Sequence, residues 1–260
     1  MPLVNYMKSS GVGFLELSAP PANTYSYEMM KELDAAILDI RMDEEVHAIV
    51  LTGAGEKFFC AGADINMLNR ATAAFKYSFC LHANETLNRL EQTPKLVIAA
   101  LNGHTVGGGL EVALAADLRV AKKDGGKIGL PEVKLGVLPG TGGTQRLARH
   151  IGRSRAIELM VRGELMSFED ALALGLVNAI LDGDRFRDDV MEYAAAFVPP
   201  RTASMAAGRI KRAVVSGLEA SFGEGLALER ELQQQLFLSS DAREGLSAHL
   251  EKREPRFQGS

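Results

Sequence analysis

The sequence predicts an α/β protein that ends in a helical C-terminal portion. In the first half, short strand-like runs of apolar residues alternate with longer amphipathic stretches. After residue 145 the strand signals fade and helical patterns take over. With 260 residues, 47% of them hydrophobic, the chain is long enough to bury one large core. We therefore expect one main α/β domain with added helices.

Three strands are expected in the first half, over residues 14–17, 48–52 and 96–101. Each is a short run of apolar, mainly β-branched or large side chains. The third run is almost continuously apolar, which is typical of a strand buried on both faces of a sheet.

Two long helices are expected between these strands. The first covers residues 27–41, with its apolar positions on one face and Ser26 as its N-cap. The second covers residues 73–92 and stops before Pro94, because proline has no amide hydrogen to continue the helix.

Capping signals predict the shorter helices that follow. Ser154 is expected to cap a helix over residues 157–161. Ser167 and Asp170 have the spacing of a capping box.

Two further helices are expected near the end of the chain, over residues 221–237 and 241–252, the second opened by Asp241. The turn Val-Pro-Pro-Arg before them is the expected boundary. It divides a core domain, residues 1–198, from a C-terminal helical region, residues 199–260.

Charge and cysteine content exclude several classes of partner. A formal net charge of −4 provides no overall field that would attract nucleic acid or an anionic membrane. Cys60 and Cys80 form neither a CxxC pair nor part of a metal-ligand set, and two cysteines are too few for a disulfide framework. The longest core-like run, residues 96–101, is too short to cross a bilayer. The first residues, MPLVNYMKSSGVG, lack the basic stretch followed by a long apolar run that is typical of a signal peptide. We expect a cytoplasmic protein without a bound metal, a membrane partner or a nucleic-acid partner.

Two glycine-bearing segments predict a site for an oxygen that gains negative charge. In LNGHTVGGGLEVALAA, three glycines at 107–109 separate a strand-like run from a helix that carries Glu111 in its first turn. Amides at a helix start are unpaired and lie at the positive end of its dipole. A second segment, FFCAGAD at 58–64, follows another strand and can aim a second amide at the same point. Two converging donors make an oxyanion hole.

Two carboxyl groups belong to the same predicted site. Glu111 lies within one helical turn of the glycines, and Glu132 follows a proline where a strand ends. Two carboxyls in one apolar pocket resist ionising together, so one holds a proton while the other accepts one. Each glutamate also has a purely structural interpretation, as an acid that stabilises the first turn of a helix.

Four stretches closely resemble the crotonase superfamily, and most of all its enoyl-CoA hydratases. They are FFCAGADI, LNGHTVGGGLEVALAADLRVA, GLPEVKLGVLPGTGGTQRL and EGLSAHLEKREPRF, in the order the family has them. The resemblance implies a crotonase-like spiral of ββα units with a C-terminal helical region that mediates trimerisation. It also implies a homo-oligomer, a trimer or a dimer of trimers.

The resemblance assigns roles to individual residues. The backbone amides of Ala63 and Gly108 are implied to form the oxyanion hole, Glu111 and Glu132 to be the two hydratase glutamates, and Gly140 to help fix water or a carboxylate. The positions implied to bind substrate or CoA are Ala22, Tyr25, Lys57, Ala61, Ala63, Asp64, Ile65, Gly108 and Lys252. Of these, Asp64 also has the position of a helix cap.

The implied activity is that of a hydro-lyase (EC 4.2.1.-) acting on a 2-enoyl-CoA thioester in fatty-acid or related acyl-CoA metabolism. No cofactor is implied, because CoA is part of the substrate. Residues 66–85 are the expected wall of the acyl pocket.

Two alternatives remain at this stage. One is an isomerase, decarboxylase or hydrolase with the same oxyanion hole. The other is an RNA-binding relative, which basic residues at 146–155 and 201–212 favour and the net acidity opposes. The arginines near 146–155 are also explained as a solvated face or a subunit contact.

Overall fold

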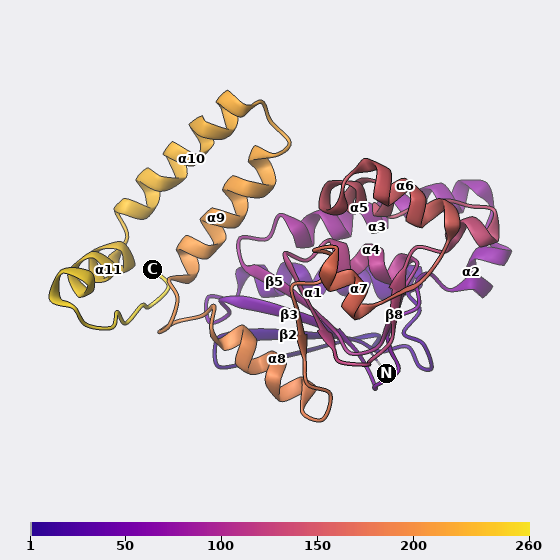
Figure 1. Cartoon of the computed structure of the whole chain (residues 1–260), viewed down its shortest axis with the longest axis horizontal. Coiled ribbons are helices and arrows are strands. Elements are labelled where there is room, and N and C mark those ends of the chain that lie inside the picture. The colour runs from indigo at the N-terminus through magenta and orange to yellow at the C-terminus, as the bar shows by residue number, and fades with distance from the viewer. Residues whose placement is uncertain (1) are drawn as a thin grey trace.

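The structure is a computed structural model that describes residues 2–260. It contains two sheets, helices packed around them, and a helical arm that projects from one end (Figure 1). The strands are β1 (Val4–Ser9), β2 (Val12–Leu17), β3 (Ala48–Gly53), β4 (Phe58–Cys60), β5 (Leu96–Leu101), β6 (His104–Val106), β7 (Leu118–Lys122), β8 (Lys127–Gly129), β9 (Met166–Ser167) and β10 (Ala179–Leu181). The α/β fold class is therefore confirmed.

Eleven α-helices and one short 3₁₀ helix are present among residues 2–260. They are α1 (Tyr27–Met42), α2 (Ile65–Arg70), α3 (Ala73–Glu91), α4 (Gly108–Leu114), η1 (Glu132–Leu135), α5 (Gly143–Ile151), α6 (Arg153–Arg162), α7 (Phe168–Ala173), α8 (Phe186–Ala195), α9 (Ser204–Gly217), α10 (Phe222–Phe237) and α11 (Ser240–Glu251). None of them is long and apolar enough to cross a membrane.

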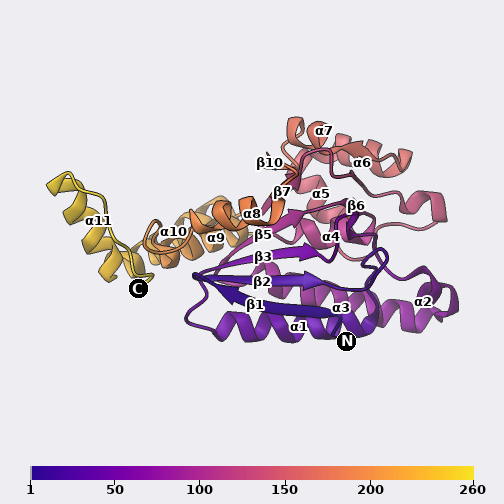
Figure 2. The same ribbon diagram turned by 90° about the horizontal axis from the view of Figure 1, so that it is seen from below.

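The larger sheet has six strands in the order β1-β2-β3-β5-β7-β10, and only the β1–β2 pair is antiparallel. Side chains alternate between its faces. Ile49 and Leu51 join the core cluster that contains buried residues of α1 and α3, whereas Ala48 and Val50 join the cluster that contains α8. Figure 2 shows α1 and α3 below the sheet. Burial on both faces explains why the β3 and β5 runs are apolar throughout.

The smaller sheet has the order β4-β6-β8-β9 and places the functional segments. Strand β4 leads into the turn before α2, β6 leads into α4, and β8 leads into η1. Because β4, β6 and β8 are parallel, their carboxyl ends meet at one edge of the sheet.

Several caps expected from the sequence are confirmed. The Ser26 side chain accepts a hydrogen bond from the Met29 amide at 3.3 Å, as an N-cap of α1 should. Ser167 and Asp170 form a complete capping box at α7. Helices α1, α3 and α10 differ from their predicted ranges by one residue at an end.

Two cap predictions are wrong. Gly152, not Ser154, begins α6, because a backbone φ of +83° at that glycine turns the chain sharply between α5 and α6. Asp241 does not open α11, since Ser239 is its N-cap. The Asp241 carboxylate instead accepts hydrogen bonds from the amides of residues 258 and 259, which fastens the tail.

Helices α9, α10 and α11 form an arm that leaves the sheets at one end (Figures 1 and 2). Helix α9 docks where Gly208 meets Pro94, since a Cβ at Gly208 would lie 2.3 Å from the Pro94 carbonyl oxygen. The Lys211 ammonium lies 2.8 Å from Asp117 Oδ2 and donates to the Lys95 carbonyl at 3.1 Å. Both charged side chains are largely buried. The boundary at residue 198 remains a prediction.

Replacing Lys211 tests this docking. We expect Lys211→Ala to lower the free energy of unfolding by about 3 to 5 kcal/mol at pH 8, because the Asp117 carboxylate is left buried without its counter-ion. Urea denaturation followed by circular dichroism measures the change. The double variant Lys211→Met with Asp117→Asn should recover a large part of the loss. A loss below about 1 kcal/mol for Lys211→Ala would show that the pair does not anchor the arm.

Candidate active site

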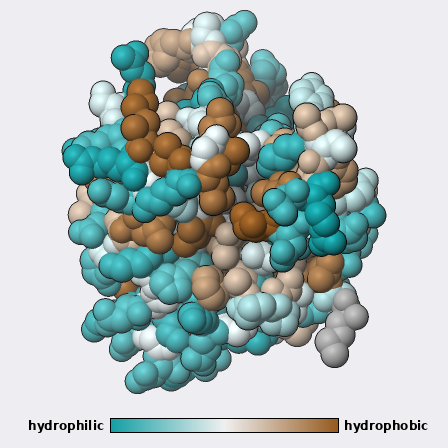
Figure 3. Space-filling view, turned by 90° about the vertical axis from the view of Figure 1, so that its right-hand side faces the viewer, coloured by the Kyte–Doolittle hydropathy of each residue, from teal (hydrophilic) through white to brown (hydrophobic). Residues whose placement is uncertain are grey.

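A cavity of about 310 Å³ lies beside α2, where the carboxyl ends of β4, β6 and β8 meet. Figure 3 looks onto this end of the molecule and shows apolar side chains gathered in the middle of the face. The lining residues are Tyr25, Ala61, Gly62, Ala63, Ile65, Leu68, Lys76, Val106, Gly107, Gly108, Glu111, Pro131, Glu132, Lys134, Leu135, Val137, Leu138, Gly140 and Thr141. All five residues predicted to be catalytic are among them.

The two glycine-bearing segments lie against one another at this cavity. A Cβ built on Gly62 would be 2.9 Å from the backbone nitrogen of Gly108. The Tyr25 amide donates to the Gly62 carbonyl at 2.9 Å, and the Asp64 amide donates to the Tyr25 carbonyl at 3.0 Å. Within residues 2–260, the amides of Ala63 and Gly108 donate no hydrogen bond of their own. Two free donors are therefore brought together at the cavity.

Glycine is required at the start of α4 because neighbouring atoms leave no room for a side chain. A Cβ on Gly108 would lie 2.1 Å from the Tyr25 hydroxyl oxygen, and one on Gly109 would lie 1.9 Å from the Cys60 carbonyl oxygen. Real side chains do not tolerate such distances, so Gly108 and Gly109 let the start of α4 approach Tyr25 and β4 closely.

Glu111 is held rigidly and is only 2% exposed. Its Oε1 accepts hydrogen bonds of 2.7 Å from the amides of Thr141 and Gly143, and its Oε2 accepts one from the Thr141 hydroxyl. The Tyr25 hydroxyl lies 3.2 Å from the same Thr141 oxygen. These partners stabilise a buried carboxylate and fix its orientation.

Glu132 has a different environment. It begins η1 directly after Pro131, and its Oε2 is buried without a hydrogen-bond partner among the described residues. Burial, with a smaller contribution from the Glu111 charge, raises the pKa of Glu132 to about 7. A group with that pKa both gives and takes a proton near neutral pH. A Cβ on Gly107 would lie 3.0 Å from Glu132 Oε1, so this carboxyl also faces the glycine turn.

Some of the residues predicted to bind substrate lie at the cavity and others do not. Tyr25, Ala61 and Ile65 line it. Ala22 is not among the lining residues, and its carbonyl accepts a hydrogen bond from the Ala61 amide at 3.0 Å. Asp64 is not among them either, and it caps α2 by accepting from the amide of residue 66 at 2.8 Å.

The two predicted lysine contacts to CoA also lie outside the lining. Lys57 immediately precedes β4, and its ammonium is 5.7 Å from the centroid of the Phe58 ring. Lys252 ends α11, at the opposite end of the molecule from α2 (Figure 1). Within one protomer, the structure does not bring Lys252 to the cavity.

Sequence reasoning missed three residues of the cavity region. It assigned no role to the Thr141 amide and hydroxyl or to the Gly143 amide, which bind Glu111. It also missed Lys76, which lies on α3 inside the expected acyl wall. In the sequence, Lys76 is a single lysine between Phe75 and Tyr77. A solvent-exposed lysine gives the same pattern, so the sequence alone does not identify Lys76 as a cavity residue.

Two arginines of the basic cluster near residue 146 are paired within the protein. The Arg146 guanidinium is 2.9 Å from Glu91 Oε2 and donates to the Asn88 side chain at 2.7 Å. Arg149 pairs with Glu219 at 2.9 Å. These pairs occupy two of the basic residues on which the RNA-binding interpretation of this cluster depends.

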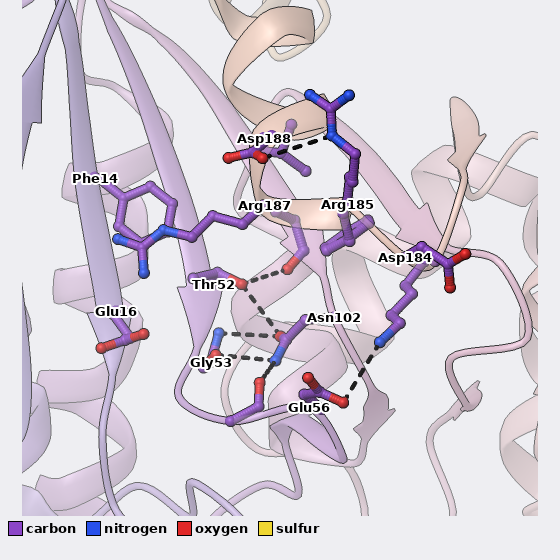
Figure 4. Close-up of a pocket in the computed structure, with 16 residues that line it drawn as sticks. Phe14, Glu16, Thr52, Gly53, Glu56, Asn102, Asp184, Arg185, Arg187 and Asp188 are labelled. Atoms are coloured by element: carbon purple, nitrogen blue, oxygen red, sulfur yellow. Dashed lines mark hydrogen bonds and ion pairs between the residues drawn. The ribbon is translucent and has the colours of Figure 1, made fainter.

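A second cavity, of about 380 Å³, lies between the larger sheet and α8 (Figure 4). None of the predicted site residues lines it. Its Asn102 side chain donates to the carbonyls of Gly53 and Gly55 at 2.9 and 2.7 Å, and Arg187 lies 4.7 Å from the centroid of the Phe14 ring. These polar groups stabilise a loop and a helix start, which is a structural role.

Comparisons with known proteins agree on one family. The model of the family described as enoyl-CoA hydratase/isomerase matches residues 7–260. The chain is 36% identical over 247 residues to a short-chain-enoyl-CoA hydratase of Clostridium acetobutylicum, covering 95% of this chain and 94% of that protein. It is 38% identical over 256 residues to a probable enoyl-CoA hydratase of Bacillus subtilis, covering 95% of each.

A solved structure is similar over the whole chain. A crystal structure from Geobacillus kaustophilus, described as "Enoyl-CoA hydrates", superposes with a TM-score of 0.95 at 46% identity, covering 100% of this chain and 98% of that one.

The raised pKa of Glu132 has a consequence for stability. In the unfolded chain this carboxyl ionises near pH 4.5, whereas in the folded protein it stays neutral up to about pH 7. Its ionisation therefore costs stability as the pH rises from about 4.5 to 7. We expect Glu132→Gln to raise Tm relative to the unchanged protein at pH 8 but hardly at pH 4.5. Differential scanning calorimetry at both pH values measures this, and an equal effect at both would show that Glu132 ionises normally.

Proposed function

Because the chain belongs to the enoyl-CoA hydratase/isomerase family, we propose that it is an enoyl-CoA hydratase. It adds water reversibly across the α,β double bond of a 2-enoyl-CoA thioester. The observation that carries the proposal is one cavity that holds two free amides, of Ala63 and Gly108, and two carboxyl groups, of Glu111 and Glu132.

In the proposed reaction, the two amides bind the thioester oxygen, on which negative charge grows as an enolate forms. Glu111, oriented by Thr141 and Gly143, removes a proton from water as the water oxygen bonds to Cβ. Glu132 supplies a proton to Cα, and the amide of Gly140 helps to position the water. Hydration thus leaves Glu111 protonated and Glu132 ionised, and proton exchange with solvent resets the pair.

The CoA portion is proposed to lie along the segment from Ala22 to Tyr25 and the one from Ala61 to Ile65, with Lys57 near the pyrophosphate. Lys252 reaches CoA only if another protomer supplies it, because α11 lies far from the cavity of its own chain.

We propose that the protein is a homo-oligomer, a trimer or a dimer of trimers, assembled through the helical arm. Large apolar side chains on the arm are exposed, among them Leu218 at 78%, Phe222 at 82% and Leu250 at 82%. A surface of this kind is typical of a subunit interface. A cytoplasmic location is proposed with it, and the free thiols of Cys60 and Cys80 suit that compartment.

Hydratase activity is tested with crotonyl-CoA. The unchanged protein should bleach the absorbance of the conjugated thioester and form 3-hydroxybutyryl-CoA. Glu132→Gln and Glu111→Gln should each lower kcat by about 10² to 10⁴, the usual contribution of one general acid or base. For hydration, kcat/KM should fall as the pH rises through about 7, because Glu132 must be protonated.

Glu192→Gln, an exposed change on α8, is the matched control and should retain full activity. Full turnover by Glu132→Gln would contradict the acid/base assignment. A product that carries no hydroxyl group would favour the isomerase alternative.

The oligomer is tested by analytical ultracentrifugation. Leu250→Glu should dissociate the assembly, whereas Gln234→Glu, which adds the same charge at an exposed polar position of α10, should not. A monomeric mass for the unchanged protein would overturn this part of the proposal.

A further inference from the structure

Two lysines, Lys76 and Lys134, line the candidate active-site cavity without an ion pair among the described residues, and only Lys76 is partly buried. Lys76 projects from α3 and is half-buried, and a Cβ on Gly140 would lie 3.9 Å from its Nζ. The ammonium is 5.7 Å from the centroid of the Phe79 ring. Across residues 2–260, its Nζ makes no ion pair within 4 Å and no hydrogen bond. Lys76 therefore presents an unpaired positive charge to the cavity.

Among residues 2–260, no carboxylate oxygen of the lining forms an ion pair within 4 Å of the Lys76 ammonium. Glu111 is bound by Thr141 and Gly143. Glu132 has a pKa of about 7, so near neutral pH about half of the molecules carry it uncharged. Lys134 is exposed, and its stem runs along Gly163, with Cγ and Cε each 3.3 Å from a Cβ built there.

Much of the remaining lining is apolar, with Ile65, Leu68, Leu135, Val137 and Leu138 among it. A saturated acyl tail would fill such a surface without any charge. An ammonium group placed there loses part of its hydration and gains nothing from a hydrocarbon chain. An anionic group on the ligand recovers that loss through a charge-assisted hydrogen bond.

Resting on the proposed hydratase function, we propose that the acyl group taken by this site ends in a carboxylate, which Lys76 binds. The substrate class is then the mono-CoA thioester of an unsaturated dicarboxylic acid. The thioester oxygen sits at the amides of Ala63 and Gly108, the reacting carbons lie between the two glutamates, and the chain continues past Gly140 to the ammonium.

A competing role is that Lys76 only tunes Glu132. Its positive charge does lower the pKa of Glu132, although less than burial raises it. In that role Lys76 would act equally on every enoyl thioester and would move the pH profile of each. The carboxylate role acts on one class of substrate only, so the two roles can be separated.

The experiment compares three kinds of substrate with the unchanged protein. The first is crotonyl-CoA, and the second kind is the mono-CoA thioesters of trans-2-pentenedioic and trans-2-hexenedioic acid. The third kind is the same two thioesters with the free carboxylate replaced by a neutral primary amide. We expect kcat/KM for at least one carboxylate ester to exceed that of its matched amide by about tenfold to a hundredfold. Two chain lengths are included because the lysine stem is flexible.

Variants then assign the preference to Lys76. Lys76→Met should remove the carboxylate preference, measured as the ratio of kcat/KM for a carboxylate ester to kcat/KM for its matched amide, and Lys76→Arg should retain most of it. Lys31→Met, which removes an exposed charge from α1, is the control for net charge and should change nothing.

The outcomes separate the two proposals. Turnover of none of these esters by the unchanged protein overturns the hydratase function itself. Turnover of crotonyl-CoA with no preference for either carboxylate over its amide overturns the carboxylate subsite and leaves the hydratase function standing. A preference that survives Lys76→Met, or a loss shared equally by all substrates with a shifted pH profile, overturns the role given to Lys76.

Discussion

The site depends on how closely the backbone of α4 approaches β4. At Gly109 the gap to the Cys60 carbonyl is too small even for a methyl group, and at Gly108 the Tyr25 hydroxyl fills the space that a Cβ would need. This contact sets the free amide of Gly108 beside the turn that carries the amide of Ala63. It also starts α4 at the depth that buries Glu111. The donors and the first carboxyl thus take their positions from one packing constraint.

The two glutamates share a cavity but have opposite surroundings. Glu111 is almost fully buried and receives three hydrogen bonds, which suit the charged form. Glu132 is partly desolvated and has an oxygen without a partner, which suits the neutral form. Burial disfavours the charged form of a carboxyl group unless hydrogen bonds compensate for the lost hydration. The two environments differ because the amides and hydroxyl of the 141–143 segment donate hydrogen bonds to Glu111.

The sequence was most informative where a local rule applies. Ser26 and Ser167 were identified as caps because their side chains bond to amides only a few residues away. Ser154 and Asp241 fit the same rule and are not caps, since a left-handed glycine at 152 and a tertiary contact to the tail decide those ends. The strand β1 was missed because it is an edge strand with a mostly exposed pattern. The cavity is lined by residues far apart in the sequence, from Tyr25 to Thr141. The position of Lys76 opposite Gly140 depends on this long-range packing, which no local rule predicts. Family resemblance supplied the roles of Ala63 and Gly108, which composition cannot distinguish from other small residues.

The reliance on main-chain donors changes how this protein should respond to random variation. Alanine scanning is the usual way to find important positions. It changes nothing at Ala63, and at Gly108 it adds a methyl group and so reports only crowding against Tyr25. A library screen would therefore single out glycines that tolerate nothing larger, and it would not detect the two amide hydrogens proposed to bind the carbonyl. Natural drift meets the same asymmetry: acidic side chains can be exchanged one at a time, but the two amides proposed to bind the carbonyl persist as long as the chain folds.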